Sequence, residues 1–376
     1  MRHLSYITAC LLSGALFTAC SNLEETGCLS CGDSQETVAQ PYSVSFRLGG
    51  SVSPATRAAS VTQTDEEKAL TSLYAVVFAD TDAASTMKDG TENQAVDNDL
   101  FVAAISVSLD NYNSGSATEP NLSFVLGEQG HYNICFVANP SEQLTAAITG
   151  LTKGVSKVSD FEALKEETAP ALTNFLMTSP YYAVTTAYGK QATIAQVALT
   201  RAVARIDVLN QADGITVKQL VFHNYGAKSR LIAADTPAEA FDGTCIETEK
   251  LYTPADGLEG DSQSAVEGGK NYYGKQIYTY EQYAASGTDA ADEEASRPTL
   301  EIIYSVPSSG QWFTHTVKFE TDPDAAVVPL KRNNHYLVTL SNRNGQIEFI
   351  LGVKDWDKGD TFGKPSSDFA QGTDNL

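Results

Sequence analysis

The pattern of hydrophobic and polar residues along this chain predicts mostly short β-strands. Apolar and polar residues alternate without interruption over Tyr42–Leu48, which places Tyr42, Val44, Phe46 and Leu48 on one side of a strand. Further apolar or alternating runs follow, separated by segments rich in Gly, Asp, Asn and Ser. The strands predicted after the first are 70–78, 101–109, 122–126, 132–137, 181–188, 193–199, 215–223, 277–283, 300–306, 312–319 and 335–341.

Two segments favour short helices. Ser159-Asp160-Phe161-Glu162 has the spacing of a capping box, with apolar Leu164 and Leu172 further on, and residues 141–148 form a second candidate that ends at Gly150. Strands outnumber helices, so we expect a mainly β protein. Its length of 376 residues predicts two β-sandwich domains, 58–200 with a short helical insertion and 201–376.

The N-terminus has the features of an export signal. Arg2 and His3 precede the apolar run Leu4–Phe17, which is too short for a permanent membrane span and suits a signal peptide. The run ends in Phe17-Thr18-Ala19-Cys20, which resembles a bacterial lipobox. We therefore predict that residues 1–19 are a lipoprotein signal peptide and that Cys20 is lipidated. The alternative is an ordinary secretory signal cut nearby; either signal takes the chain out of the cytoplasm.

The segment 20–57 reads as a tether, a strand and a flexible loop. The tether carries Cys28 and Cys31, for which a local disulfide is the simplest interpretation. The loop after the first strand is built from small and polar residues, and its one basic residue, Arg57, is followed by Ala58. An exposed Arg in such a loop is accessible to a trypsin-like protease. The alternative is a loop Arg without a special role.

This order of lipobox, strand and basic loop resembles the fimbrillins, the subunits of type V pili. The resemblance implies that an Arg-specific protease cuts between Arg57 and Ala58 and that the strand carrying Tyr42, Val44, Phe46 and Leu48 is then lost. A strand from the next subunit would fill the groove. Arg201-Ala202-Val203-Ala204-Arg205-Ile206-Asp207-Val208 is similar to the fimbrillin segment between two sandwich domains. The implied fold is two tandem transthyretin-like β-sandwiches.

The C-terminal segment resembles the one that fimbrillins donate to a neighbour. It presents four apolar residues at two-residue intervals and ends in Asp-Trp; the implied donor residues are Ile347, Phe349, Leu351, Val353 and Trp356. Many stalk subunits carry a Pro-rich linker before this segment, whereas here only Asn342-Arg343-Asn344-Gly345 precedes it. The alternative is that the segment folds back as a hairpin.

The negative net charge of the chain argues against two classes of partner. The chain has 25 Lys and Arg residues against 47 Asp and Glu residues, a net charge of −22. A nucleic-acid partner is therefore not expected, because such binding needs a basic surface. Docking on anionic lipid is disfavoured for the same reason.

Candidate chemistry along the chain is sparse. Arg201 and Arg205 could bind an anion, but a solvated strand face that pairs with nearby acids is the favoured interpretation. His335 is expected to be a packed strand histidine, since no second His or Cys lies at metal-ligand spacing. The C-terminal acids do not match an EF-hand loop, so we expect no metal. Cys135 and Cys245 are expected to be buried free thiols.

No motif of an enzyme is present. The sequence lacks a Gly-x-Ser-x-Gly elbow, a phosphate-binding Gly loop and a His-Glu-x-x-His pair. We expect no catalytic residues and no cofactor. The hypothesis is an adhesion-supporting pilus subunit, an outer-membrane lipoprotein as precursor and extracellular when mature. Its partners would be other subunits, the membrane through the precursor's lipid and an Arg-specific protease. The alternatives are a tip or anchor subunit, or a surface lipoprotein that binds glycans through exposed aromatic residues.

Overall fold

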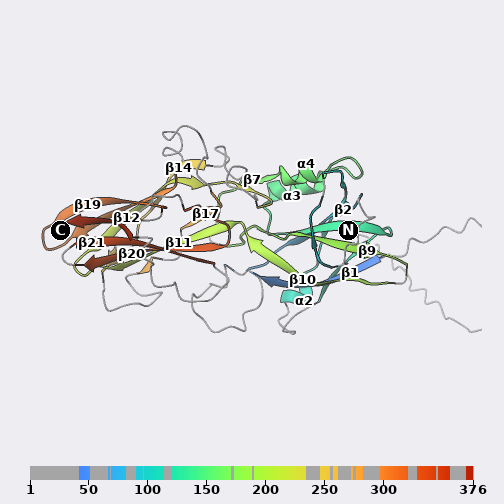
Figure 1. Ribbon diagram of the computed structural model, residues 1–376, viewed down its shortest axis with the longest axis horizontal. Coiled ribbons are helices and arrows are strands. Elements are labelled where there is room, and N and C mark those ends of the chain that lie inside the picture. Colours follow the sequence, from blue (N-terminus) through green and yellow to red (C-terminus); the bar gives the residue numbers. More distant parts are fainter. Residues whose placement is uncertain are drawn as a thin grey trace, which may run out of the picture. The chain divides into compact units, whose positions relative to one another are not determined.

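Strands dominate the computed structural model, which confirms the prediction of a mainly β protein (Figure 1). The structure describes residues 42–50, 67, 69–81, 90–95, 97–113, 121–170, 173–188, 190–233, 246–254, 257–260, 272–273, 277–282, 297–320, 328–343, 346–355 and 370–375. Several residues singled out by the sequence lie outside this set: Cys20, Cys28, Cys31, Arg57, Ala58, Cys245 and Trp356.

The N-terminal part of the described chain forms a nine-stranded sheet. In spatial order its main path is β3 (Glu92–Asn93), β9 (Tyr181–Thr186), β6 (Gly130–Ala138), β8 (Met177–Thr178), β10 (Ala192–Arg201), β1 (Tyr42–Gly50) and β5 (Leu122–Leu126). Two further strands extend from β6: β2 (Leu73–Ala79) pairs with β6 and with β4 (Leu100–Ser106). The first predicted strand is therefore an internal strand of this sheet.

This sheet folds over on itself to form a sandwich. One layer is β5-β1-β10, the other contains β2, β6 and β9, and the two-residue strand β8 connects β10 to β6. Inward side chains from both layers share one core; they include Phe46 from β1, Phe124 from β5 and Phe136 from β6. The ring of Phe46 lies 4.6 Å from that of Phe136 and 6.1 Å from that of Phe124, measured between centroids.

The part of the chain that the structure describes contains the short helices α2 (Asp110–Asn113), α3 (Glu142–Thr149) and α4 (Val158–Glu162). Helix α3 confirms the prediction for this segment, and the Ser141 hydroxyl caps it by accepting from the Leu144 amide at 3.2 Å. The predicted capping box at 159–162 was wrong in register, because α4 begins at Val158 and the Asp160 carboxylate accepts from the Lys157 amide. Among the described helices, none is long and apolar enough to cross a membrane.

Two more sheets contain the C-terminal strands. The six-stranded sheet has the order β16 (Tyr272–Tyr273), β11 (Val203–Gln211), β20 (Asn334–Arg343), β21 (Gln346–Asp355) and β22 (Ala370–Asn375), with β17 (Tyr278–Tyr280) also paired to β11. The five-stranded sheet has the order β14 (Ile246–Tyr252), β12 (Thr216–Gly226), β18 (Thr299–Val306) and β19 (Gln311–Lys318), with β15 (Leu258–Glu259) also paired to β12. A two-stranded sheet joins β7 (Lys165–Glu166) and β13 (Ser229–Arg230).

The two larger C-terminal sheets share a second core, as a β-sandwich does. Strand β11 contributes Ala204, Ile206 and Val208, and strand β18 contributes Leu300 and Ile302. A third cluster joins residues from both parts, including Phe161 from α4 and Tyr278 from β17. Residues 40–376 form one compact unit, and the division at 200/201 stays a prediction.

Candidate functional site

The segment expected to be removable, β1, fills the centre of the β5-β1-β10 layer. It runs antiparallel to β5 from Tyr42 to Phe46 and parallel to β10 from Val44 to Gly50. Among the described strands, β5 pairs with β1 alone, and residues 192–199 of β10 likewise pair with β1 alone. Strand β1 therefore joins two segments that have no other strand partner within the described part of the chain.

The side chains of β1 divide between core and surface as the alternation predicted. Val44, Phe46 and Leu48 are buried, and the partly buried Tyr42 packs against the same core. On the opposite face, Arg47 is exposed and donates from Nε to Asn121 Oδ1 at 3.0 Å. Removing this strand would leave three apolar pockets and two unpaired strand edges.

The two described residues that flank segment 51–66 are both held at the end of β10. Gly50 pairs with Leu199, and the Glu67 carbonyl accepts a 3.0 Å hydrogen bond from Arg201 Nε. The described residues on the two sides of segment 51–66 therefore lie close together, at the end of β10. This segment contains Arg57 and Ala58, which lie outside the described residues.

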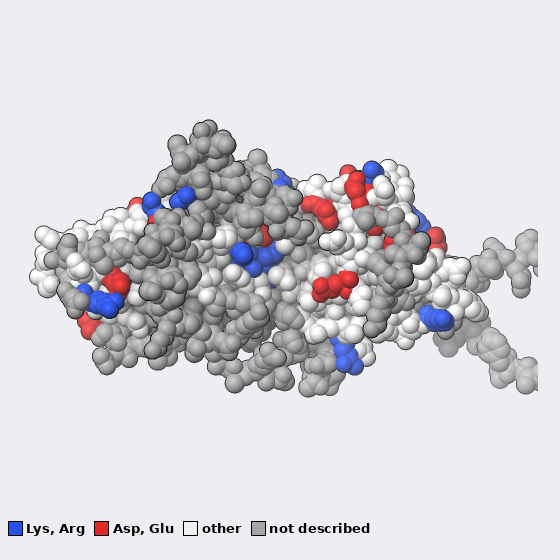
Figure 2. Space-filling view, in the orientation of Figure 1, with Lys and Arg blue, Asp and Glu red and all other residues white. Residues whose placement is uncertain are grey.

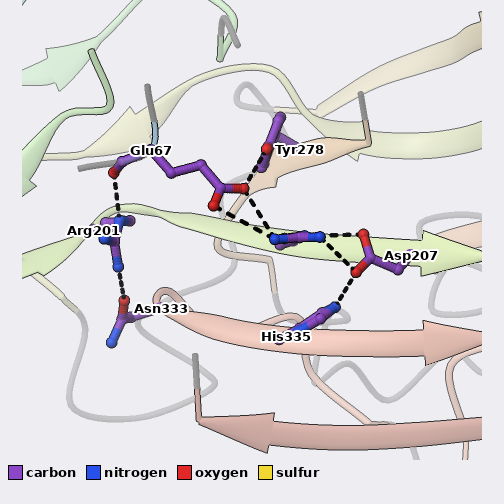
Figure 3. Close-up of polar contacts among 7 residues, drawn as sticks. Glu67, Arg201, Asp207, Tyr278, Asn333 and His335 are labelled. Carbon is purple, nitrogen blue, oxygen red and sulfur yellow. Dashed lines mark hydrogen bonds and ion pairs between the residues drawn. The ribbon is translucent and has the colours of Figure 1, made fainter. Parts of the chain in front are cut away.

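A buried polar network surrounds Glu67 (Figure 3). Its carboxylate accepts from the Tyr278 hydroxyl at 2.6 Å and from Arg205 Nη1 at 3.1 Å, while Arg201 Nη1 donates to Asn333 Oδ1 at 3.2 Å. The exposed fraction of Glu67 is 1%. A buried carboxylate needs such donors to offset its loss of hydration.

Strand β11 brings the rest of the network together. Arg205 pairs in register with Tyr278 on one side and His335 on the other, and Asp207 follows two residues later on the same face. Arg205 makes a bidentate pair with Asp207, with two contacts of 2.9 Å, and His335 Nε2 contacts the same carboxylate (Figure 3). The opposite face of β11 carries the apolar residues of the second core.

The network corrects one interpretation of the sequence. Val203, Arg205 and Asp207 do share one face, but Arg205 and Asp207 are buried rather than solvated, as is Arg201. The expected pairing with acids is confirmed, since Arg205 contacts Asp207 and Glu67. The expected solvation was wrong, because Glu67, more than 130 positions earlier in the chain, packs against this face. The interpretation of His335 as a packed strand histidine is confirmed. Arg205 is occupied by two carboxylates of its own chain, so nothing here supports an external anion site.

The Asp207 carboxylate is sensitive to pH in a predictable direction. Burial raises its pKa, but the charge interactions and hydrogen bonds with His335 and Arg205 together outweigh burial, so the net pKa is lowered. A lowered pKa contributes stability above the unfolded-state pKa, and that stability is lost as pH falls through the folded-state pKa.

We therefore expect the stability difference between the unsubstituted chain and Asp207→Asn to shrink as pH falls below about 4. Urea unfolding at pH 7, 5, 4 and 3 measures it. The exposed Asp97→Asn serves as a control with a much smaller pH-dependent difference. A difference for Asp207→Asn that stays constant from pH 7 to pH 3 contradicts the expectation.

The C-terminal segment expected to be a donor forms a hairpin in this structure. Strand β21 pairs antiparallel with β20 through ten residue pairs and on its other edge with β22. Ile347, Phe349 and Leu351 are fully buried in the second core, and Val353 packs against it partly buried. The structure thus shows the folded-back arrangement, the alternative left open by the missing Pro-rich linker. Trp356 lies outside the described residues.

Other candidate chemistry adds no site among the described residues. Cys135 is a buried free thiol, as predicted, and burial raises its pKa to about 12. No group of three or more metal-ligating side chains occurs in the part of the chain that the structure describes. On the face drawn in Figure 2, the described Lys and Arg side chains lie in small separate groups rather than in one extended basic patch.

Part of the chain matches a known protein family. The family described as "Major fimbrial subunit protein (FimA)" matches residues 42–224, a match that starts at the first residue of β1. No curated protein sequence matches the chain.

Solved structures that share the fold include the following three proteins. A protein from Parabacteroides distasonis described as a cell adhesion protein has 15% identity and a TM-score of 0.54, covering 85% of this chain and 97% of its own. The tip fimbrial protein Mfa3 from Porphyromonas gingivalis, with a C-terminal truncation, has 17% identity and a TM-score of 0.51, covering 84% and 100%. A protein from Bacteroides eggerthii, also described as a cell adhesion protein, has 16% identity and a TM-score of 0.50, covering 85% and 97%.

Proposed function

Because residues 42–224 make this chain a member of the fimbrillin family, a family of cell-surface pilus subunits rather than enzymes, we propose that it polymerises by strand exchange. The observation that carries the proposal is the position of β1, which among the described strands is the only one that joins β5 to residues 192–199 of β10. Its loss opens a strand-wide groove lined by apolar side chains, and such unpaired edges recruit a strand from another chain.

In this proposal the uncut chain is protected from early assembly. Lipidation at Cys20 holds the precursor at the outer membrane, and β1 occupies its groove at high effective concentration because it is tethered. An Arg-specific protease then cuts between Arg57 and Ala58 and makes β1 a separate peptide that can leave. The support is positional: Gly50 and Glu67 hold the two ends of the segment that contains this bond.

We propose β21 as the strand that is donated. Its inward residues Ile347, Phe349 and Leu351 repeat the two-residue spacing of Val44, Phe46 and Leu48. Donation requires β21 to leave β20 and the second core first, since its apolar side chains are buried there. Its departure would also free β22 from its only strand partner among the described residues.

Replacing Arg57 tests the activation step. Arg57→Gln is expected to leave the chain uncut, so that N-terminal sequencing on cells finds no chain beginning at Ala58 and electrophoresis without boiling shows no ladder. Arg47→Gln is the matched control, because Arg47 lies in the β1 strand rather than in the loop. A ladder formed by Arg57→Gln would reject activation at this bond.

A peptide tests the donor strand separately. A peptide with the sequence of residues 346–355 is expected to bind the cut monomer saturably and to block ladder formation. The same peptide with Phe349→Asp should bind at least tenfold more weakly, because a charged side chain would have to enter the pocket of an apolar one (about 1.4 kcal/mol per tenfold). Equal binding of the two peptides, or binding of neither, would count against β21 as donor.

A tip subunit is the second candidate, and one observation favours it. Strand β21 is already paired on both edges and its apolar face is buried in its own chain, as suits a subunit that accepts a strand and donates none. Immunogold labelling separates the two: a tip subunit appears at fibre ends, a stalk subunit along the length. An anchor subunit would instead keep its lipid and β1.

Glycan binding has weaker support. The exposed aromatic residues Tyr188 and Trp312 have exposed fractions of 72% and 64%. Tyr188 follows β9 in the nine-stranded sheet, whereas Trp312 lies on β19 in the five-stranded sheet. Single exposed aromatic side chains are common on protein surfaces and do not by themselves form a binding platform.

A further inference from the structure

The pairing of β1 has a consequence for the subunit after cleavage, before any partner strand arrives. Strand β5 runs antiparallel to β1, and β10 runs parallel to it, so β5 and β10 are antiparallel to each other across β1. Once β1 has left, both face the vacated space with unpaired backbone groups. Strands of this relative direction can pair directly if one moves sideways by about 4.8 Å, the spacing of one strand.

Resting on the proposed function, we propose that the cut subunit partly closes its own groove by pairing β5 with the first residues of β10. The register through β1 defines the new pairs: Ser123 and Thr193 both face Ser45, while Leu122 and Ile194 both face Phe46. Sideways movement without a shift in register brings Ser123 opposite Thr193. The inward residues Leu122 and Ile194 stay inward, so the core side remains apolar.

The aromatic contacts in the core favour the same movement. Phe124 of β5 already lies 6.1 Å from Phe136 of the facing layer, ring centroid to ring centroid, and Phe46 lies beside both. When Phe46 leaves with β1, Phe124 is the neighbouring ring that can move into the vacated space. Closure therefore restores packing as well as backbone hydrogen bonds, both of which an empty groove would lose.

The closure covers only part of the groove. Residues 122–124 can pair with 192–194, but residues 197–199, which faced Leu48, Gly49 and Gly50, extend beyond β5. Residues 197–199 therefore remain an open strand edge. An incoming strand would pair first with this edge and then displace β5 from β10. A strand that cannot displace β5 would not fill the groove, so partial closure would disfavour non-specific pairing.

A disulfide between positions 123 and 193 reports the closed state. Both side chains are exposed, and in the uncut chain they lie on either side of β1, about 10 Å apart, beyond the roughly 7 Å limit between Cα atoms for a disulfide. In a Ser123→Cys/Thr193→Cys chain, we expect the bridge to form under mild oxidation only in the monomer that has been cut after Arg57 and has lost β1. Peptide mapping identifies the bridge, and mass measurement of the monomer shows whether β1 has left.

A matched pair serves as the control. Ser45→Cys/Thr193→Cys places both positions on adjacent paired strands and should form its bridge in the uncut chain. If β1 stays bound after the cut, both the strand exchange and the closure are overturned. If β1 leaves and positions 123 and 193 form no bridge, the closure alone is overturned and strand exchange stands.

Hydrogen exchange of the unsubstituted chain covers the case in which the double variant fails to fold. In the monomer without β1, closure predicts that the amides of residues 122–124 exchange at least tenfold more slowly than those of Val197 and Leu199; Ala198 is left out because its amide donates to the Tyr182 hydroxyl at 2.9 Å. Equally fast exchange in the two segments would overturn the proposal. Adding back a peptide with the sequence of β1 should protect both segments.

Discussion

Replacing Phe46 by alanine should lower the free energy of unfolding of the uncut chain by about 3–5 kcal/mol, the usual cost of removing a buried phenylalanine. Phe46 is 1% exposed and lies in the middle of an aromatic group with Phe124 and Phe136. For a chain with a free energy of unfolding of about 5–15 kcal/mol, this loss is a large part of the total. Urea unfolding of the Phe46→Ala chain, followed by tyrosine fluorescence, measures the change.

The adjacent residue provides a matched control. Arg47→Ala changes the same strand on its exposed face and should cost less than about 1 kcal/mol, because it removes a hydrogen bond to Asn121 at the surface. A further comparison tests whether β1 leaves: after the cut and loss of β1, chains with and without Phe46→Ala should have the same stability. A difference of several kcal/mol between the cut monomers would mean that β1 stays in place.

Replacing Glu67 by glutamine should have a comparable effect, about 3–5 kcal/mol, because it breaks a buried ion pair by removing one partner. Arg205 would keep Asp207 but lose the charged partner at 3.1 Å, and the Tyr278 hydroxyl would lose a charged acceptor at 2.6 Å. Thermal and urea unfolding of the cut and uncut chains measure the loss. The effect should persist after cleavage, since Glu67 lies on the retained side of the cut.

An exposed ion pair serves as the control for Glu67. Glu128 contacts Lys153 at 3.1 Å with side chains that are 71% and 62% exposed, so Glu128→Gln should change stability by less than about 1 kcal/mol. Equal effects of Glu67→Gln and Glu128→Gln would show that the buried network contributes no more than a surface pair.

The sequence predicted individual strands correctly where apolar and polar residues alternate clearly. The alternation at Tyr42–Leu48 predicted a strand and its inward side chains, and the run at 122–126 gave a strand with the observed limits. The structure places β1 between β5 and β10 because residues about 80 and 150 positions away pair with it. The alternation within β1 does not indicate which distant strands pair with it.

The burial of the polar network around Glu67 could not be predicted from the local sequence pattern either. Alternation placed Arg205 and Asp207 on one face, but whether that face meets water depends on what covers it. Glu67 covers it, and it stands in the acidic run Asp65-Glu66-Glu67, where nothing in the sequence distinguishes one carboxylate from the others. For β21 the four alternating apolar residues are compatible with a donated strand and with a hairpin, since both bury the same face.

The pairing of β1 with β10 also affects the order in which the chain can fold. The Ser45 hydroxyl contacts the Ala192 carbonyl across 147 positions of sequence, so the first strand to emerge is completed by one of the last of its sheet. Contacts of such long range are slow to form, because much loop entropy is lost before they stabilise the fold. Strand β1 therefore lacks a complete set of strand partners until residue 199 has been synthesised, and we expect the β5-β1-β10 layer to be among the last parts of the fold to form.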